Sequence, residues 1–150
     1  MSLREQLDED LKSAMRAKDH ARLSVIRSIK AAILAQETRA ERVTLDDGEI
    51  LGVIAKEIKE RKDANQEFEK GRRNDLVEKN LMEIDILSSY LPEPFTEDEL
   101  KKIIDTAVQD TGSTSPKDMG KVMTLVNPQV RGRAEGRHVA ELVKARLTTP

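Results

Sequence analysis

The segment LSSYLPEPFTEDEL, at residues 87–100, carries the strongest structural signals of the chain. Pro92 and Pro94 stand close together, and proline disfavours helical backbone in the residue before it. Thr96 then opens a capping box, because its side chain can accept the backbone N–H of Glu99 while the Glu99 carboxylate reaches back. One helix is therefore predicted to end before Pro92 and another to begin after Thr96, with a stiff linker between them.

This linker divides the chain into an N-terminal domain, residues 1–91, and a C-terminal domain, residues 95–150. Upstream of the linker, apolar residues recur at helical spacing, and few residues would stop a helix. Helices are predicted over about 2–18, 20–38, 47–70 and 74–91, with a polar loop at 38–43. Asp19, the Asp46–Glu49 segment and Asn74 are the predicted N-caps, and Gly71 is the predicted end of the third helix.

Three further helices are predicted downstream of the linker. The first runs from Thr96 to Gly112, a typical C-terminal stop. Ser115 and Pro116 start the second, which Asn127-Pro128 is expected to end. The last covers about 135–147. Because no strand pattern is found, the predicted fold class is all-α, with an N-terminal four-helix bundle and a C-terminal three-helix bundle.

Composition restricts the chemistry and the location of the protein. Among 150 residues, 37% are apolar and 36% charged, which is typical of long helices with one solvated face. The absence of cysteine excludes disulfide bonds, thiolate metal sites and thiol nucleophiles. The N-terminal segment lacks the apolar core of a secretory signal, and no apolar run is long enough to span a membrane. We therefore expect a cytoplasmic protein without a membrane-embedded part.

Charge is distributed unevenly along the chain, whose net charge is −2. Between Gly112 and Pro150, seven basic residues stand against three acidic ones, which gives +4 and leaves −6 for residues 1–111. This asymmetry favours a polyanion as partner of the C-terminal part, although chance clustering on a solvated surface would produce the same count. The helix predicted over 47–70 carries basic residues that alternate with acidic ones, as on an exposed helix face: Lys56, Lys59, Arg61 and Lys62. Nucleic-acid contact by these residues is the alternative.

The basic residues of the C-terminal part gather in two short segments. Gly132 and Gly136 alternate with arginines that can grip a phosphate bidentately, and glycine lets a ligand approach the backbone closely. Two lysines lie one turn apart at the start of the sixth predicted helix. The candidate phosphate-binding residues are Lys117, Lys121, Arg131, Gly132, Arg133, Gly136 and Arg137. The alternative is a tight connection that carries solvated cations.

Several blocks of the sequence together resemble the YqeY-like proteins. They are LSVIRSIK at 23–30, VIAKEIKERKD at 53–63, the hinge from Glu83 to Pro92, KDMGKVM at 117–123 and GRAEGR at 132–137. The C-terminal part is similar to the tail of the GatB subunit of glutamine-dependent tRNA amidotransferases. The resemblance covers essentially the whole chain.

The resemblance implies an all-helical fold of two different bundles. In the amidotransferases the related tail contacts tRNA, while the chemistry belongs to an amidase subunit and to the body of GatB. One position departs from the family pattern: Glu135 stands where Asp is usual before Gly136. Because Asp caps a helix better than Glu, the expected cap of the last helix is weakened.

The sequence offers no catalytic constellation. Carboxylate pairs such as Glu83 with Asp85 are expected at caps or on polar faces, where they stay ionised rather than acquire the pKa of a general base. His20 and His138 are too few and too far apart for a metal centre, which needs three or four ligands. No catalytic residue, metal or cofactor is therefore predicted.

Three functions remain open at this point. The first is an accessory protein that binds tRNA or another structured RNA. The second is an auxiliary of a tRNA-dependent amidotransferase, a carbon–nitrogen ligase that uses glutamine as amide donor. The third is a helical interaction module whose N-terminal bundle binds a protein partner or a second copy.

Overall fold

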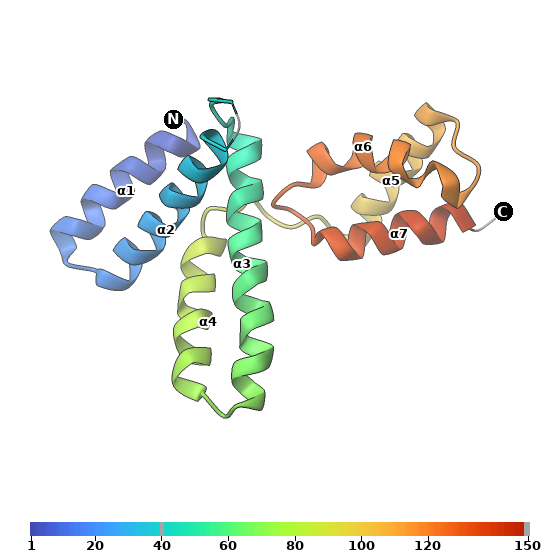
Figure 1. Ribbon diagram of the computed structural model, residues 1–150. Coiled ribbons are helices and arrows are strands. Elements are labelled where there is room, and N and C mark those ends of the chain that lie inside the picture. The colour runs from blue at the N-terminus through green and yellow to red at the C-terminus, as the bar shows by residue number, and fades with distance from the viewer. Residues whose placement is uncertain (40, 149–150) are drawn as a thin grey trace. The chain divides into compact units, whose positions relative to one another are not determined.

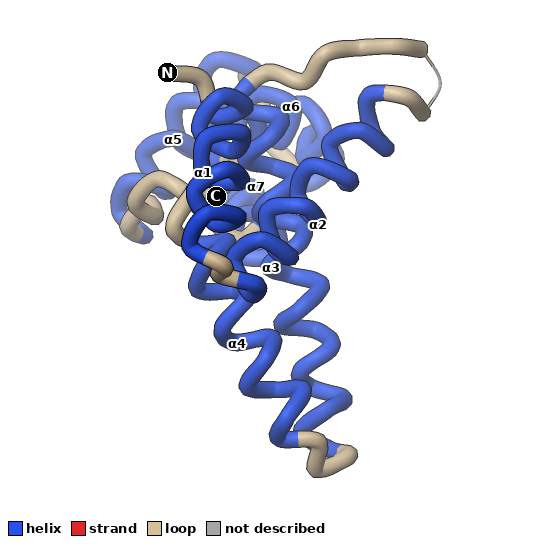
Figure 2. Tube along the Cα trace, turned by 90° about the vertical axis from the view of Figure 1, so that its left-hand side faces the viewer, coloured by secondary structure: helices blue, strands red, loops and turns tan. Residues whose placement is uncertain are grey.

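A computed structural model describes residues 1–39 and 41–148. Within these ranges the backbone forms seven α-helices and one 3-10 turn, and no strand (Figure 2). The prediction of an all-α fold is confirmed. No helix in the described ranges combines the length and the apolar character needed to cross a lipid bilayer.

The first of two compact units, Met1–Leu91, consists of two helical hairpins (Figure 1). Its helices are α1 (Leu3–Ala17), α2 (His20–Glu37), α3 (Asp47–Lys70) and α4 (Asn74–Ser88). α1 packs against α2, and α3 packs along α4. Contacts of α2 with both α3 and α4 join the hairpins, while the far ends of α3 and α4 project beyond α1 and α2.

Side-chain caps fix the starts of α2 and α3 where the sequence predicts them. The Arg22 backbone N–H donates to Asp19 Oδ1 at 3.1 Å. The Glu49 N–H donates to Asp46 Oδ1 at 2.8 Å, and the Asp46 N–H donates to Glu49 Oε1 at 3.2 Å. Both predicted caps are confirmed, including the reciprocal capping box.

The turn between α3 and α4 differs from the prediction. Asn74 does not cap α4: it is the first helical residue, and the preceding Arg73 makes no side-chain cap bond. Instead, a backbone bond to the end of α3 holds the turn: the Arg73 N–H donates to the Phe68 carbonyl at 2.8 Å. Gly71 is the C-cap of α3, as predicted, but the left-handed conformation, with a φ of 57°, belongs to Arg72.

Aliphatic side chains from all four helices form the core of the first unit. The members buried to at least 98% are Leu7, Val25, Ile26, Ile29, Ile50, Ile54 and Leu87. Met15 follows Leu3, Leu7 and Leu11 at four-residue spacing, which predicts an inward position, but it is 53% exposed and Ala14 is buried in its place. The reason is geometric: each step of four residues overshoots a full turn by about 40°, so a stripe of such steps drifts off the core face.

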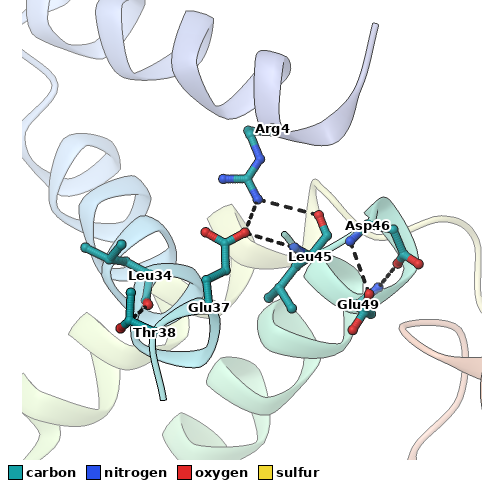
Figure 3. A network of polar contacts seen from close by, with 7 residues as sticks. All are labelled: Arg4, Leu34, Glu37, Thr38, Leu45, Asp46 and Glu49. Carbon is teal, nitrogen blue, oxygen red and sulfur yellow. Dashed lines mark hydrogen bonds and ion pairs between the residues drawn. The ribbon is translucent and has the colours of Figure 1, made fainter. Parts of the chain in front are cut away.

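A polar network ties the start of α1 to the end of α2 and the start of α3 (Figure 3). Arg4 Nη2 donates to Glu37 Oε2 at 2.5 Å, and the Leu45 N–H donates to the same oxygen at 2.9 Å. These bonds lower the pKa of Glu37, the bond from the Leu45 N–H contributing most. The network therefore holds the segment that leads into the Asp46 capping box.

Polar side chains also lie between α3 and α4. Arg61 donates to Glu57 Oε2 at 2.6 Å and to Glu83 Oε1 at 3.0 Å, and its side chain is only 15% exposed. The expectation that Arg61 belongs to an exposed charged face is wrong, because this ion pair turns it toward α4. Asn80 Nδ2 donates to Oδ1 of the buried Asn65 at 3.0 Å.

The second compact unit, Pro92–Pro150, is described up to residue 148. It contains α5 (Glu97–Thr111), the 3-10 turn η1 (Pro116–Asp118), α6 (Met119–Val130) and α7 (Gly136–Thr148). The Thr96–Glu99 capping box is confirmed, and Gly112 closes α5 with a φ of 64°. The core comprises Leu100, Ile104, Ala107, Val108, Val122, Val126, Val130, Val139, Val143 and Leu147.

The predicted bounds of the sixth helix are wrong at both ends. Pro116 opens η1 rather than an α-helix, Ser115 makes no side-chain cap bond, and α6 begins at Met119. At the other end α6 runs through Pro128 to Val130. In the last turn a proline removes only one intrahelical bond, and the continued helix keeps Val130 in the core.

Candidate phosphate-binding site

The structure separates the predicted phosphate-binding residues into two groups at opposite ends of α6. Lys117 and Lys121 lie at its start, and the segment from Arg131 to Arg137 follows its end. A helix of 12 residues such as α6 is about 18 Å long. The two groups therefore do not form one pocket, although both belong to the second unit.

At the start of α6, the two lysines lie in successive helical elements. Lys117 belongs to η1 and Lys121 to α6, and both are exposed. Lys121 Nζ lies 3.9 Å from Asp118 Oδ1, and Asp118 Oδ2 also accepts the Thr114 N–H at 3.1 Å. Asp118 therefore offsets part of the positive charge at this end.

A tight turn follows α6, and its arginines have different roles. The Arg133 N–H donates to the Val130 carbonyl at 2.9 Å, and Gly132 has a φ of 71°, where glycine is favoured. Arg131 is exposed to solvent. Arg133 is half-buried, and its Nε donates to the Glu93 carbonyl at 2.8 Å.

Arg133 also contacts Phe95. The centre of its guanidinium lies 3.6 Å from the centroid of the Phe95 ring, a cation–π contact. In addition, the Phe95 N–H donates to the Arg133 carbonyl at 2.9 Å. Glu93 and Phe95 were not among the predicted residues, because no local spacing relates them to a residue about 40 positions further along the chain.

The first turn of α7 contains Gly136 and Arg137, which are both exposed. The Val139 N–H donates to the Glu135 carbonyl at 3.0 Å, so Glu135 occupies the N-cap position. A Cβ added at Gly136 would meet no atom within 4 Å, so this glycine leaves an open surface above the backbone. Within the described residues, no hydrogen bond occupies the N–H groups of Gly136 and Arg137.

Acidic groups of α5 border this turn. His138 Nε2 lies 2.8 Å from Glu97 Oε1, which places the first turn of α5 beside that of α7. Hydrogen bonds from the backbone and side chain of Thr96 lower the pKa of Glu99, and the charge of Arg133 adds to this effect. The turn is therefore a surface of mixed charge, on which Arg131 and Arg137 are the exposed cations.

Two of the groups considered for chemistry, Glu83 and His138, have structural partners. Glu83 bonds to Arg61, and Asp46 with Glu49 forms the α3 capping box. The described residues contain no group of three or more His, Cys, Asp or Glu side chains positioned to hold a metal ion.

Comparison with known proteins identifies relatives across most of the chain. Residues 4–147 match the family described as Yqey-like protein. A protein of Pyrenophora tritici-repentis named "Altered inheritance of mitochondria protein 41, mitochondrial" is 34% identical over 131 residues, which cover 86% of this chain and 71% of that protein. The protein of the same name from Kluyveromyces lactis is 44% identical over 84 residues, 56% of this chain and 45% of the relative. That from Saccharomyces cerevisiae (strain YJM789) is 34% identical over 112 residues, covering 71% and 60% respectively.

The names of these relatives contradict the cytoplasmic location that we expected for the protein. Composition predicts a cytoplasmic protein, but the relatives are named as mitochondrial proteins, so that prediction is wrong. That prediction rested on composition, and a charged chain without cysteine or a membrane span suits several aqueous compartments equally well.

Proposed function

The chain belongs to the YqeY-like family, and from that premise we propose that its C-terminal unit binds the phosphate backbone of structured RNA, with tRNA as the favoured ligand. The observation that carries this proposal is the pair of exposed arginines, Arg131 and Arg137, on either side of the Gly132 turn. Their guanidinium groups can each grip a phosphate bidentately. The free N–H groups at the start of α7 add favourable partial charges next to Arg137.

The remaining predicted residues have supporting roles in this proposal. Gly136 leaves the backbone open to a phosphate oxygen, since a Cβ there would meet no atom within 4 Å, and Gly132 gives the turn its shape with a φ of 71°. Lys117 and Lys121 form a second contact at the far end of α6, which would engage a different phosphate of the same RNA. Contacts separated in this way suit an extended duplex backbone better than a small anionic ligand.

RNA shape rather than base identity is the feature that such a surface would recognise. Only three aromatic residues occur in the chain, Phe68, Tyr90 and Phe95. Tyr90 is buried, and Phe95 packs against the core of its unit and against Arg133. Base stacking needs accessible aromatic rings, so backbone contacts would dominate.

The two units have separate roles in this proposal. The N-terminal four-helix bundle, residues 1–91, and the C-terminal three-helix bundle, residues 95–150, would be distinct domains. The resemblance to the GatB tail favours a tRNA-dependent amidotransferase as the enzyme with which the protein works. The chain would then be an auxiliary that positions tRNA while its partner performs the carbon–nitrogen ligation, and the N-terminal bundle would contact that partner.

A tRNA titration at several salt concentrations tests the proposal. We expect the Arg131→Ala/Arg137→Ala variant to bind more weakly, with a salt slope lower by roughly 1.4 to 1.8, because each lost phosphate contact removes about 0.7 to 0.9. Arg16→Ala/Arg27→Ala is the matched control, since it removes the same charge from exposed positions of α1 and α2. Absence of tRNA binding, or an equal loss in both variants, would refute the site.

A further inference from the structure

We infer that Arg133 is a positioning residue, which holds the Gly132 turn in the shape that presents Arg131 and Arg137 to phosphate, and is not itself a phosphate ligand. This inference rests on the proposed RNA-binding function. It changes the role of one residue of the candidate set and adds Phe95 and the backbone of Glu93 to the structure of the site.

The contacts of Arg133 support this role because its backbone N–H, its backbone carbonyl, its Nε and the face of its guanidinium are all engaged within the protein. Its backbone N–H and carbonyl bond to Val130 and Phe95, each at 2.9 Å. Its Nε donates to the Glu93 carbonyl at 2.8 Å, and the Phe95 ring covers the guanidinium at 3.6 Å. An arginine that binds phosphate side-on needs its Nε, which here is already bonded.

The position of Arg133 explains why the turn needs such a residue. Gly132, in the left-handed region, is the most permissive point of the turn, and its freedom would let Arg131 take many directions. Arg133 follows directly and is fastened to the segment before α5 by one main-chain bond to Phe95, by the bond from its Nε to the Glu93 carbonyl and by the ring contact. The α5 capping box in turn fixes that segment, so the turn is anchored to a helix start.

The charges around Arg133 also support a positioning role. The charge of Arg133 acts on Glu99, whose carboxylate completes the α5 capping box. A phosphate placed on Arg133 would lie near this carboxylate, whereas Arg131 and Arg137 have exposed side chains. The anion-accessible charge of the turn is therefore carried by its outer arginines.

The test compares Phe95→Leu, Arg133→Lys and Arg133→Ala in the full chain, with tRNA as probe. Phe95→Leu removes no charge, yet we expect it to weaken tRNA binding by roughly two- to five-fold, the factor that corresponds to one cation–π contact. Arg133→Lys keeps the charge but loses the planar fork, so it should resemble Arg133→Ala rather than wild type. Amide hydrogen exchange at residue 95 should accelerate in all three variants, because its bond to the residue 133 carbonyl loosens.

Leu142→Ala is the stability control, since Leu142 of α7 packs against the same core and is not among the proposed phosphate-binding residues. A comparable affinity loss in Leu142→Ala would overturn the inference by showing that general destabilisation suffices. Wild-type affinity in Phe95→Leu, combined with rescue by Arg133→Lys, would show instead that Arg133 binds phosphate directly. If wild-type protein binds no tRNA, the proposed function itself fails, and the inference falls with it.

Discussion

At the scale of single residues, Tyr90 shows how one buried hydroxyl group joins distant parts of the first unit. Tyr90 is 7% exposed, and its hydroxyl donates to Asp10 Oδ2 at 2.6 Å. Arg22 Nη2 lies 3.4 Å from the same carboxylate oxygen. Burial, and then the bond to Asp10, raise the pKa of Tyr90 to about 12. The end of the first unit is thus fastened to α1 just before the linker.

The raised pKa of Tyr90 predicts a loss of stability at high pH. In the unfolded chain the phenol titrates near 10.0, whereas the folded protein keeps the proton until about 12. The stabilising contribution is therefore complete below pH 10 and decreases as the pH rises toward 12. Tyr90 is the only tyrosine and tryptophan is absent, so the ultraviolet absorbance of tyrosinate reports this group alone.

Asp10→Asn is the control for this titration. It removes the charged acceptor but keeps the burial, so the pKa should move only part of the way back to the ordinary value. A Tyr90 that titrates at its ordinary value in the folded wild-type protein would contradict the contact.

At the scale of elements, the α3–α4 hairpin depends on a pair of asparagines. Asn65 is 6% exposed, and its Oδ1 accepts a bond from Asn80 Nδ2 at 3.0 Å. Asn80→Ala should lower the free energy of unfolding by about 1–3 kcal/mol, because it leaves a buried acceptor without its partner. Chemical denaturation measures this change.

The double variant Asn65→Leu/Asn80→Leu separates the polar bond from packing. Replacing both partners removes the unsatisfied group, so the double variant should recover much of the stability lost in Asn80→Ala. If instead it is less stable than Asn80→Ala, the asparagines contribute through shape and packing rather than through their mutual bond.

Also at this scale, local spacing predicted most helix starts but not every end. The caps at Asp19, Asp46 and Thr96 need only residues three positions away, and all three are confirmed. Pro128 was misread because the burial of Val130, a tertiary effect, outweighs the single bond that the proline removes. The apolar Leu81 of α4 is 55% exposed, whereas the neighbouring polar Asn80 bonds to the buried Asn65.

At the scale of the whole molecule, the sequence predicted the all-α class but could not assemble the candidate site. Charge and glycine content located the residues from Lys117 to Arg137 and already divided them into two segments, before and after most of the sixth predicted helix. The contact of Arg133 with Phe95 is tertiary and leaves no trace in local sequence. Composition likewise could not distinguish the compartment that the relatives' names indicate.

The last prediction concerns the two units as folding entities. Their cores share no residue: one contains Ile54, and the other contains Val126. Both side chains are fully buried, so truncation to alanine should cost several kcal/mol for Ile54, in the range of about 2–5, and less for the smaller Val126. If each unit is a domain, Ile54→Ala should accelerate hydrogen exchange only in α1–α4, and Val126→Ala only in α5–α7. If either variant accelerated hydrogen exchange in both units, the two units would unfold together. The division at Pro92 would then describe which backbone segments contact each other and not two independently stable domains.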